Sequence, residues 1–313
     1  MTVYEYPFTE KPNIDRCVLA LGFFDGVHVA HRDLLLKAKE AAMRRGLSFG
    51  IFTFRSDGKI KAGARRLYDD KEKAEIFDSL GADFTVFADF SAISGCAPED
   101  FVDRILIDDL CCRVCVAGYN FRFGKGASAG AKELTEFMRR RDAEALICDE
   151  IRAKDGSPVS ATVIRELIEE GKTEEANILL GTPYYIKGGV LHGRADGRRL
   201  GFPTANLEIG EGKIVPRLGV YRTAVDLDGR IISAVTNIGK CPTFMGESTR
   251  LEAHLIDFDG DLYGREIKVY ILGFLRDEMR FDSLEELKAQ IDIDKKATIK
   301  ENGELTWQES GLK

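Results

Sequence analysis

The sequence predicts two domains of different class, an α/β doubly wound domain followed by an all-β domain that ends in a helix. The first half alternates short apolar runs with amphipathic helical ones, which is the pattern of βαβ units on a parallel sheet. Beyond residue 182, short runs of β-branched and aromatic residues are separated by turn signals such as Asp228-Gly229, as in a small antiparallel barrel. At 313 residues the chain is long enough to bury two cores.

Strands and helices are expected to alternate in the first half. The strands are predicted at 17–23, 47–54, 83–87, 114–117 and 145–149. The helices between them are predicted at 32–45, 70–80, 98–110 and 132–141. Gly46 and Gly81 follow two of these helices, where a left-handed C-cap is expected. Ligands of such folds bind at the carboxyl ends of the strands, so functional residues are expected there.

The pattern changes after the turn residues at 155–158. Helices are predicted at 161–170 and 173–180, followed by Gly181-Thr182-Pro183. We therefore expect a boundary near residue 182, with domains at 1–182 and 183–313. A final helix is predicted at 283–292.

Bulk composition narrows the possible functions. A net charge of -7 argues against general nucleic-acid binding, which normally needs excess Lys and Arg. The N-terminus has no apolar signal-peptide core, and no stretch reaches the roughly 18 apolar residues of a membrane span. A cytoplasmic protein without membrane partners is expected. Cys112 and Cys115 match a CxxC spacing, but the surrounding CCRVCVAG indicates a buried strand rather than a metal or redox site.

The first motif with chemical meaning is GFFDGVHVAH at 22–31, where a predicted strand gives way to a helix. Gly22 and Gly26 permit a tight turn and a close approach of backbone to phosphate. The helix start points free N–H groups at an anion, and His28 and His31 can hydrogen-bond a phosphate whose charge grows in the transition state. A metal pair or two surface histidines are the alternatives, and the glycine-rich turn favours phosphate.

Two further segments fit the same pocket. GYNFRFG at 118–124 directly follows a predicted strand, so its polar residues emerge at the ligand edge. SATVIR at 160–165 opens a helix with Ser160 as a possible N-cap, although Ser and Thr at a helix start are usually only caps. Hydroxyl groups in this first turn, together with Arg165, can grip triphosphate oxygens.

These motifs resemble the Rossmann-like nucleotidyltransferase superfamily, which carries an HxGH-type motif and a later ISSTxIR-type motif. FDGVH and NFRFG are similar to its FAD synthetase branch, the N-terminal module of bacterial bifunctional riboflavin kinase/FMN adenylyltransferases, over roughly residues 15–180. The resemblance implies adenylyl transfer without a covalent intermediate. The FMN phosphate attacks the α-phosphorus of ATP, and pyrophosphate leaves.

The resemblance also implies roles for single residues. His28 and His31 would steady the transferring phosphate as catalytic groups, and Ser160, Thr162 and Arg165 would hold the leaving pyrophosphate. Asn120 and Phe121 would lie at the flavin-nucleotide site. The implied ATP- and phosphate-binding residues of this domain are Gly22, Asp25, Gly26, Ser160, Thr162 and Arg165.

The chain departs from the family pattern in several places. Ala30 replaces the usual glycine before the second histidine, and Phe23 stands where the family commonly has Asn. TFRSDG at 53–58 replaces a TFxPHP-like segment, and Ala161 replaces the second serine of ISST. Neither imidazole nor the arginine is lost.

A second ATP site is indicated around residue 200. Gly193, Gly197 and Gly201 supply flexible backbone for a loop over phosphates, although no Lys-Ser/Thr pair makes it a Walker motif. Glycine-rich turns between strands are common, so the more specific signal is the PTAN that follows. In it, Thr204 and Asn206 have the oxygen ligands that Mg²⁺ prefers.

Phosphoryl transfer to an alcohol also needs a base, and Glu252 is the candidate. It lies in RLEAHLIDF, where strand alternation puts Glu252 and His254 on one face. Taken alone, a strand glutamate is more often a solvated residue, so the assignment depends on the surrounding motifs.

Residues 183–300 resemble riboflavin kinase through LGFPTAN, the GVY at 219–221, the NIG and PTF at 237–244 and the DLYG at 261–264. The resemblance implies a six-stranded Greek-key barrel. Thr204 and Asn206 would engage ATP and Mg²⁺. Glu252 would accept the proton of the riboflavin 5′-hydroxyl as that oxygen attacks the γ-phosphate of ATP.

Together the two resemblances imply a bifunctional transferase that converts riboflavin to FMN and FMN to FAD, with ATP as co-substrate and Mg²⁺ as cofactor. A riboflavin kinase with a weakened or repurposed nucleotidyltransferase domain is the first alternative. A flavin-responsive sensor is the second, and retention of the transition-state groups argues against it. Adenylyl transfer to another acceptor, such as a pantetheine or nicotinamide nucleotide, is the third, and the attached kinase argues against it.

Overall fold

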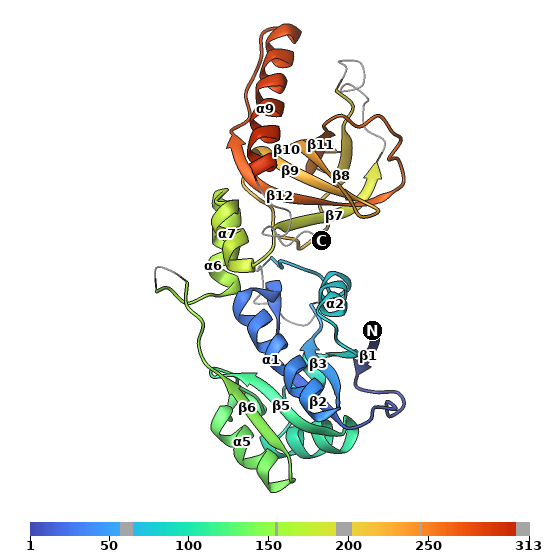
Figure 1. Cartoon of the computed structure of the whole chain (residues 1–313), viewed down its shortest axis with the longest axis vertical. Helices are drawn as coiled ribbons and strands as arrows, with labels where there is room; N and C mark the ends of the chain where they lie inside the picture. The colour runs from blue at the N-terminus through green and yellow to red at the C-terminus, as the bar shows by residue number, and fades with distance from the viewer. Residues whose placement is uncertain (57–64, 154–155, 192–201, 244–245, 305–313) are drawn as a thin grey trace. The chain divides into compact units, whose positions relative to one another are not determined.

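The computed structural model describes residues 1–56, 65–153, 156–191, 202–243 and 246–304 (Figure 1). It contains two compact units, Met1–Ala161 and Thr162–Lys313, and each is described below by itself. Helices α6 (Ala161–Glu170) and α7 (Thr173–Leu180) have the bounds that the sequence predicts. The unit division falls earlier than the predicted domain boundary at 182 because α7 packs on the barrel. Asn177 of α7 donates to the Ile271 carbonyl (2.9 Å) and accepts from the Tyr184 amide (2.8 Å).

The first unit is built on a parallel sheet with the strand order β1-β4-β3-β2-β5-β6. Its strands are β1 (Thr2–Tyr6), β2 (Cys17–Leu21), β3 (Ser48–Phe54), β4 (Phe84–Ala88), β5 (Cys112–Gly118) and β6 (Glu144–Cys148). The predicted doubly wound α/β class and its strands are thereby confirmed. β1 was not predicted, because it is a short edge strand whose side chains are largely exposed.

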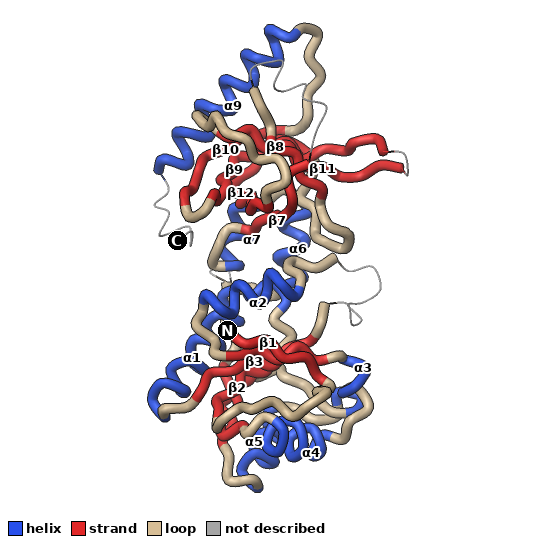
Figure 2. The backbone as a smooth tube through the Cα atoms, turned by 90° about the vertical axis from the view of Figure 1, so that its right-hand side faces the viewer, coloured by secondary structure: helices blue, strands red, loops and turns tan. Residues whose placement is uncertain are grey.

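Helices cover both faces of this sheet (Figure 2). They are α1 (Val29–Arg45), α2 (Asp70–Ser79), α3 (Phe90–Ile93), α4 (Pro98–Asp100), the π-helical segment η2 (Phe101–Asp109) and α5 (Ala131–Arg140), with short 3-10 turns η1 (Asp25–Val27) and η3 (Lys125–Ala127). Alternate residues of β2 face the two layers: Val18 packs in the core that contains α1, and Leu19 packs in the core that contains η2 and α5. A central strand buried on both sides explains the unbroken apolar run in the sequence.

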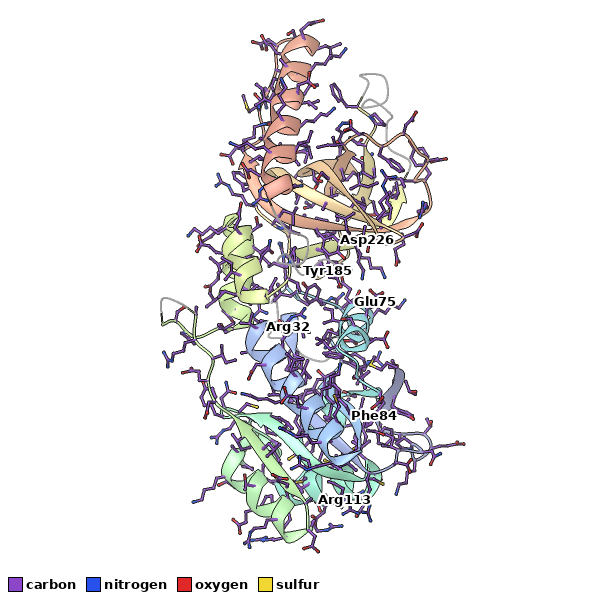
Figure 3. All side chains as sticks on the ribbon, viewed as in Figure 1. Arg32, Glu75, Phe84, Arg113, Tyr185 and Asp226 are labelled. Atoms are coloured by element: carbon purple, nitrogen blue, oxygen red, sulfur yellow. The ribbon has the colours of Figure 1, made fainter. Side chains whose placement is uncertain are left out.

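Local backbone features in this unit follow from particular residues. Gly46 (φ 62°) and Gly81 (φ 84°) adopt the left-handed conformation that the sequence predicts after α1 and α2. Phe84 of β4, labelled in Figure 3, fills the space over Gly50, where an added Cβ would clash with the ring. Cys112 and Cys115 are buried on β5, as predicted for a strand.

The second unit is a closed antiparallel barrel with the strand order β10-β11-β8-β7-β12-β9. Its strands are β7 (Tyr184–Leu191), β8 (Ala205–Glu208), β9 (Gly219–Leu227), β10 (Arg230–Thr243), β11 (Gly246–Leu255) and β12 (Glu266–Arg276). β8 pairs with β11 rather than with β9, and β12 returns to pair with both β7 and β9. This crossed order is of the Greek-key type and confirms the predicted six-stranded barrel.

The C-terminal helix α9 (Leu284–Glu304) runs alongside β9 and β10 on the outside of the barrel (Figure 1). It continues well past the predicted end at residue 292. The continuation was missed because its buried stripe is polar: Asp294, Thr298 and Asn302 recur every four residues and are 4%, 0% and 1% exposed. Asn302 donates from Nδ2 to the Thr223 carbonyl (3.1 Å), so hydrogen bonds rather than apolar side chains dock this end of the helix.

Candidate functional sites

The turn after β2 has an unusual backbone. Phe24 (φ 50°), Gly26 (φ 78°) and Val27 (φ 42°) all have positive φ values between the strand and α1. Gly22 allows the Phe24 ring to fold back over the chain, because an added Cβ would lie 2.8 Å from that ring. Asp25 is buried, and its Oδ1 accepts a hydrogen bond from the Leu67 amide (3.4 Å). The turn is therefore held in one conformation from within the unit.

This turn brings the two histidines together. The His28 and His31 rings stack with centroids 3.6 Å apart and an interplanar angle of 16°. His28 caps α1, since its Nδ1 accepts from the His31 amide (3.4 Å). The Nδ1 of His31 is buried and has no hydrogen-bond partner among the described residues.

Both imidazoles are neutral at pH 7. Burial lowers the pKa of His28 to about 4. Burial, and secondarily the neighbouring His28, lowers the pKa of His31 well below its usual value. Because Nδ1 of neutral His28 accepts a hydrogen bond, its proton is on Nε2, which is then a donor. The helix start and this donor suit an anionic ligand.

An aromatic cavity of about 440 Å³ lies at the carboxyl edge of the same sheet. Strand order reverses around β2 and β5, which is where doubly wound folds bind ligands. Gly22 and Phe121 line the cavity together with Phe54 and Phe90, whereas Asn120 is exposed and is not part of its wall. The walls suit a flat aromatic ring system.

The structure shows the surroundings of two residues that depart from the family pattern, Phe23 and Ala30. Phe23 is 39% exposed and stacks on Phe54 (centroids 6.3 Å apart), so it extends the aromatic cluster beside the cavity. Ala30 lies in the first turn of α1, where a methyl group is accommodated by ordinary helical backbone.

The later phosphate motif begins α6. Ser160 directly precedes the helix and belongs to the first unit, while Thr162 and Arg165 belong to the second. Arg165 donates from Nη2 to Thr162 Oγ1 (3.1 Å). The pyrophosphate role of these residues stays a prediction. The predicted phosphate-loop glycines Gly193, Gly197 and Gly201 lie outside the described residues.

The barrel aligns its predicted site residues in one row. Asn206 on β8 pairs directly with Glu252 on β11, and Glu252 pairs with Asn237 on β10. Directly opposed residues share a face of the sheet, with Cβ atoms about 5 Å apart. The carboxylate therefore lies between two amide side chains on the outer face of the barrel.

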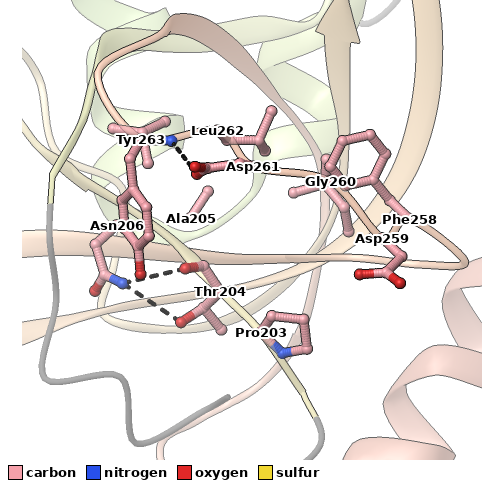
Figure 4. Close-up of a pocket in the computed structure, with 12 residues that line it drawn as sticks. Pro203, Thr204, Ala205, Asn206, Phe258, Asp259, Gly260, Asp261, Leu262 and Tyr263 are labelled. Atoms are coloured by element: carbon pink, nitrogen blue, oxygen red, sulfur yellow. Dashed lines mark hydrogen bonds between the residues drawn. The ribbon is translucent and has the colours of Figure 1, made fainter.

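Thr204 and Asn206 line a polar cavity of about 170 Å³ (Figure 4). Nδ2 of Asn206 donates to the carbonyl (3.3 Å) and to Oγ1 (3.4 Å) of Thr204, as the dashed lines show. The amide nitrogen is thus turned toward Thr204, and Oδ1 of Asn206 is turned away from it. Asp259 and Asp261 complete a wall rich in oxygen atoms.

A second cavity of about 350 Å³ lies between the barrel wall and α9. Glu252 and Asn237 line one side, and Leu287 and Ile291 of α9 line the other. Thr204 belongs to the walls of both cavities, so the polar cavity and this more apolar one are neighbours at that residue.

A buried ion pair fixes α9 over the second cavity. Arg276 at the end of β12 donates to Asp294 from both Nε (3.1 Å) and Nη2 (2.8 Å) to Oδ2. The two side chains are 18% and 5% exposed. No local pattern in the sequence indicates this pair, because its partners come from different elements and only the fold brings them together.

A histidine-bearing turn at a helix start on a doubly wound sheet, combined with a barrel in which Thr204 lines both a polar cavity and a more apolar one, indicates a two-domain transferase. Comparison with known proteins specifies the class. The FAD synthetase model matches residues 10–163, and the riboflavin kinase model matches residues 180–301. The chain belongs to the family of bifunctional riboflavin kinase/FMN adenylyltransferases.

Several relatives are similar over most of their length. The bifunctional riboflavin kinase/FMN adenylyltransferase of Listeria monocytogenes is 34% identical over 95% of this chain and 96% of its own. The protein of that name from Bacillus subtilis is 33% identical over 91% of this chain and 92% of its own. A crystal structure described as a macrolide-efflux protein from Streptococcus pneumoniae matches with a TM-score of 0.84 and 29% identity, covering 95% of this chain and 99% of that one. No helix in the described ranges combines the length and hydropathy needed to cross a bilayer.

Proposed function

We propose that this chain phosphorylates riboflavin to FMN in the barrel unit and adenylylates FMN to FAD in the α/β unit, using ATP for both steps. Membership of the family supports both activities. The observation that carries the kinase assignment is the position of Glu252, in register between Asn206 and Asn237, on the wall of a cavity that shares Thr204 with the polar cavity. A γ-phosphate near Thr204 and a substrate hydroxyl at Glu252 would then be neighbours.

In the kinase step, riboflavin occupies the cavity under α9, with its 5′-hydroxyl at Glu252. The carboxylate accepts the hydroxyl proton as the oxygen attacks the γ-phosphate of ATP. Thr204 Oγ1 would hold Mg²⁺ in the polar cavity that also contains Asp259 and Asp261. Asn206 is proposed as a second ligand, and for this its side-chain amide has to turn so that Oδ1 instead of Nδ2 faces Thr204. When bound, the ion neutralises charge on the polyphosphate.

In the adenylylation step, a phosphate oxygen of FMN attacks the α-phosphorus of ATP, and pyrophosphate leaves. No proton has to be removed from the attacking group, because a phosphate is already ionised. His28 donates from Nε2 to the charge that develops on the transferring phosphate, and His31 adds a second imidazole beside it.

The aromatic cavity lined by Phe54, Phe90 and Phe121 would take the flavin ring. Ser160, Thr162 and Arg165 are proposed for the pyrophosphate, and Asn120 for the rim of the flavin-nucleotide site.

A time course with riboflavin, ATP and Mg²⁺, analysed by chromatography, tests the proposal. FMN should appear first and FAD later. A sample supplied directly with FMN and ATP tests the second step alone. FMN that accumulates without FAD in both samples would reduce the function to a riboflavin kinase with a weakened or repurposed nucleotidyltransferase unit. Absence of FMN from riboflavin would contradict the kinase assignment.

A further inference from the structure

A lysine of the α/β unit is buried among residues that border the aromatic cavity. Lys73 lies in α2, and only 1% of its surface is exposed. A fully buried ammonium group is rare, because its removal from water costs free energy unless other partners replace the water. Burial lowers the pKa of Lys73, and the nearby Asp70 opposes that shift. The adenylylation mechanism does not use this charge, so its presence in the interior needs another physical explanation.

The ammonium group of Lys73 holds the carboxyl end of β3. Its Nζ donates to the carbonyl oxygen of Phe54, the last residue of that strand (2.9 Å). Nζ also lies 3.4 Å from Oδ1 of Asp70. The same Asp70 oxygen accepts from the amide (2.9 Å) and the hydroxyl (2.5 Å) of Ser56. Lys73 therefore fixes the chain directly at Phe54 and, through Asp70, two residues further on.

Aromatic rings are the other neighbours of this ammonium group. Nζ lies 5.6 Å from the ring centroid of Phe23 and 5.3 Å from that of Phe87. A cation over the face of a ring is attracted to it, and more strongly when water is excluded. Because the family pattern commonly has Asn at position 23, the contact with the Phe23 ring depends on a residue in which this chain departs from its family.

These contacts connect Lys73 to the wall of the aromatic cavity. The Phe23 ring stacks on the Phe54 ring, with centroids 6.3 Å apart and an interplanar angle of 26°. Phe54 meets the edge of Phe90 (5.6 Å), and both of these residues line the cavity. One buried cation thus contacts the carbonyl of a wall residue and the ring that is stacked on it. A wall held in this way loses less conformational freedom when a ligand binds.

We infer that Lys73 is a positioning residue for the adenylylation step: its ammonium group fixes the Phe23 and Phe54 rings, so that the flavin of FMN binds to a preformed aromatic wall. This inference rests on the proposed adenylylation function of the α/β unit. Lys73 acts through the two rings and the strand end. An apolar residue in its place would free the wall and weaken FMN binding, whereas ATP binding at the histidine turn would stay unchanged.

The test is Lys73→Met in the full chain, which removes the ammonium group and keeps an unbranched stem. FAD formation is measured from supplied FMN over a range of FMN and ATP concentrations. KM for FMN should rise about tenfold, the effect of a lost hydrogen bond together with a lost cation–π contact. KM for ATP and kcat should stay within twofold. An unchanged KM for FMN, or an equal rise in both KM values, would overturn the inference.

A double-mutant cycle tests whether Lys73 acts through the Phe23 ring. Phe23→Leu removes the ring, and the double variant removes both partners of the contact. Residues that act through each other have non-additive effects. Lys73→Met should therefore raise KM for FMN only about threefold in the Phe23→Leu background. A full tenfold rise in that background would mean that the two residues act independently, which contradicts the inference.

The matched control is Leu80→Ala at the far end of α2, where Leu80 packs against the core. It should destabilise the same helix and leave KM for FMN within twofold. If it raises that KM as much as Lys73→Met does, Lys73 has only a structural role and the inference is wrong.

Should Lys73→Met fail to fold, the double change Lys73→Met with Asp70→Asn is measured in its place, because it leaves no unpaired carboxylate. The riboflavin kinase rate of each variant is the internal control for intact protein. Failure of the wild-type chain to form FAD from FMN and ATP would instead overturn the adenylylation function itself.

Discussion

The two proposed ATP sites differ in a way that follows from which group would attack the phosphorus atom in each. In the α/β unit, two neutral, buried imidazoles lie at a helix start, three and six residues after the buried Asp25. In the barrel, the central group is the carboxylate of Glu252, between two amides. A phosphate nucleophile is already ionised and needs only stabilisation of developing charge, whereas a hydroxyl must also lose a proton. The nucleophile, more than the shared ATP, therefore decides which side chains each site needs.

The largest expected effect tests the base. Glu252→Gln keeps the size and hydrogen bonding of the side chain but removes its ability to take a proton. FMN formation from riboflavin should fall about 10²–10⁴-fold, while FAD formation from supplied FMN is unchanged. Chromatographic rates of both steps, measured on the same preparation, check this. Equal losses in both steps would contradict separate sites.

Removal of an imidazole should give the reverse pattern. His31→Ala should lower FAD formation from FMN about 10²–10³-fold, as for the loss of one transition-state donor. The riboflavin kinase rate of the same variant is the internal control and should stay within twofold. An unchanged FAD rate would remove His31 from the mechanism.

The barrel site also depends on the buried ion pair between Arg276 and Asp294, whereas the candidate site of the α/β unit has two neutral histidines. Asp294→Ala leaves Arg276 without its carboxylate, and should destabilise the docking of α9 by about 3 kcal/mol. The double change Arg276→Met with Asp294→Leu should recover most of that loss, since no charge is then left unpaired. Hydrogen–deuterium exchange of the α9 amides measures both effects. Exchange at the wild-type rate in Asp294→Ala would show that the pair does not hold the helix.

The smallest expected effect concerns the pH dependence of the α/β unit. At pH 7 the His28 ring is neutral in both the folded and the unfolded chain. Between pH 6.5 and about 4 the unfolded chain binds a proton that the folded chain excludes, so stability falls as the pH falls. Titration of His28 should therefore lower the free energy of unfolding by about 2 kcal/mol as the pH falls from 7 to 5.

His28→Asn isolates that contribution, because asparagine can still cap α1 but does not titrate. The stability difference between wild type and variant, from urea unfolding at the two pH values, should shrink or reverse in favour of the variant at pH 5. A difference that does not depend on pH would mean that the His28 pKa is not lowered.

Most of the fold class was predictable because its signals are local. The βαβ alternation, the glycine C-caps at 46 and 81, and the turn before His28 all depend on residues within one or two elements. The edge strand β1 and the second half of α9 were missed for opposite reasons. β1 has no buried alternating pattern, and the buried stripe of α9 is polar, so neither matches the apolar periodicity on which strand and helix prediction relies.

The sequence alone determined which residue types each unit has for its chemistry: the two histidines three residues apart, the Thr-x-Asn pair and the strand glutamate. Only the tertiary structure decided that Asn237 lies opposite Glu252, that Arg276 meets Asp294, and that Thr204 lines two cavities. The physical reason is strand register. A shift of one residue would turn Glu252 to the barrel interior. The register is set by pairing between segments that are far apart in the chain, so no local sequence pattern indicates it.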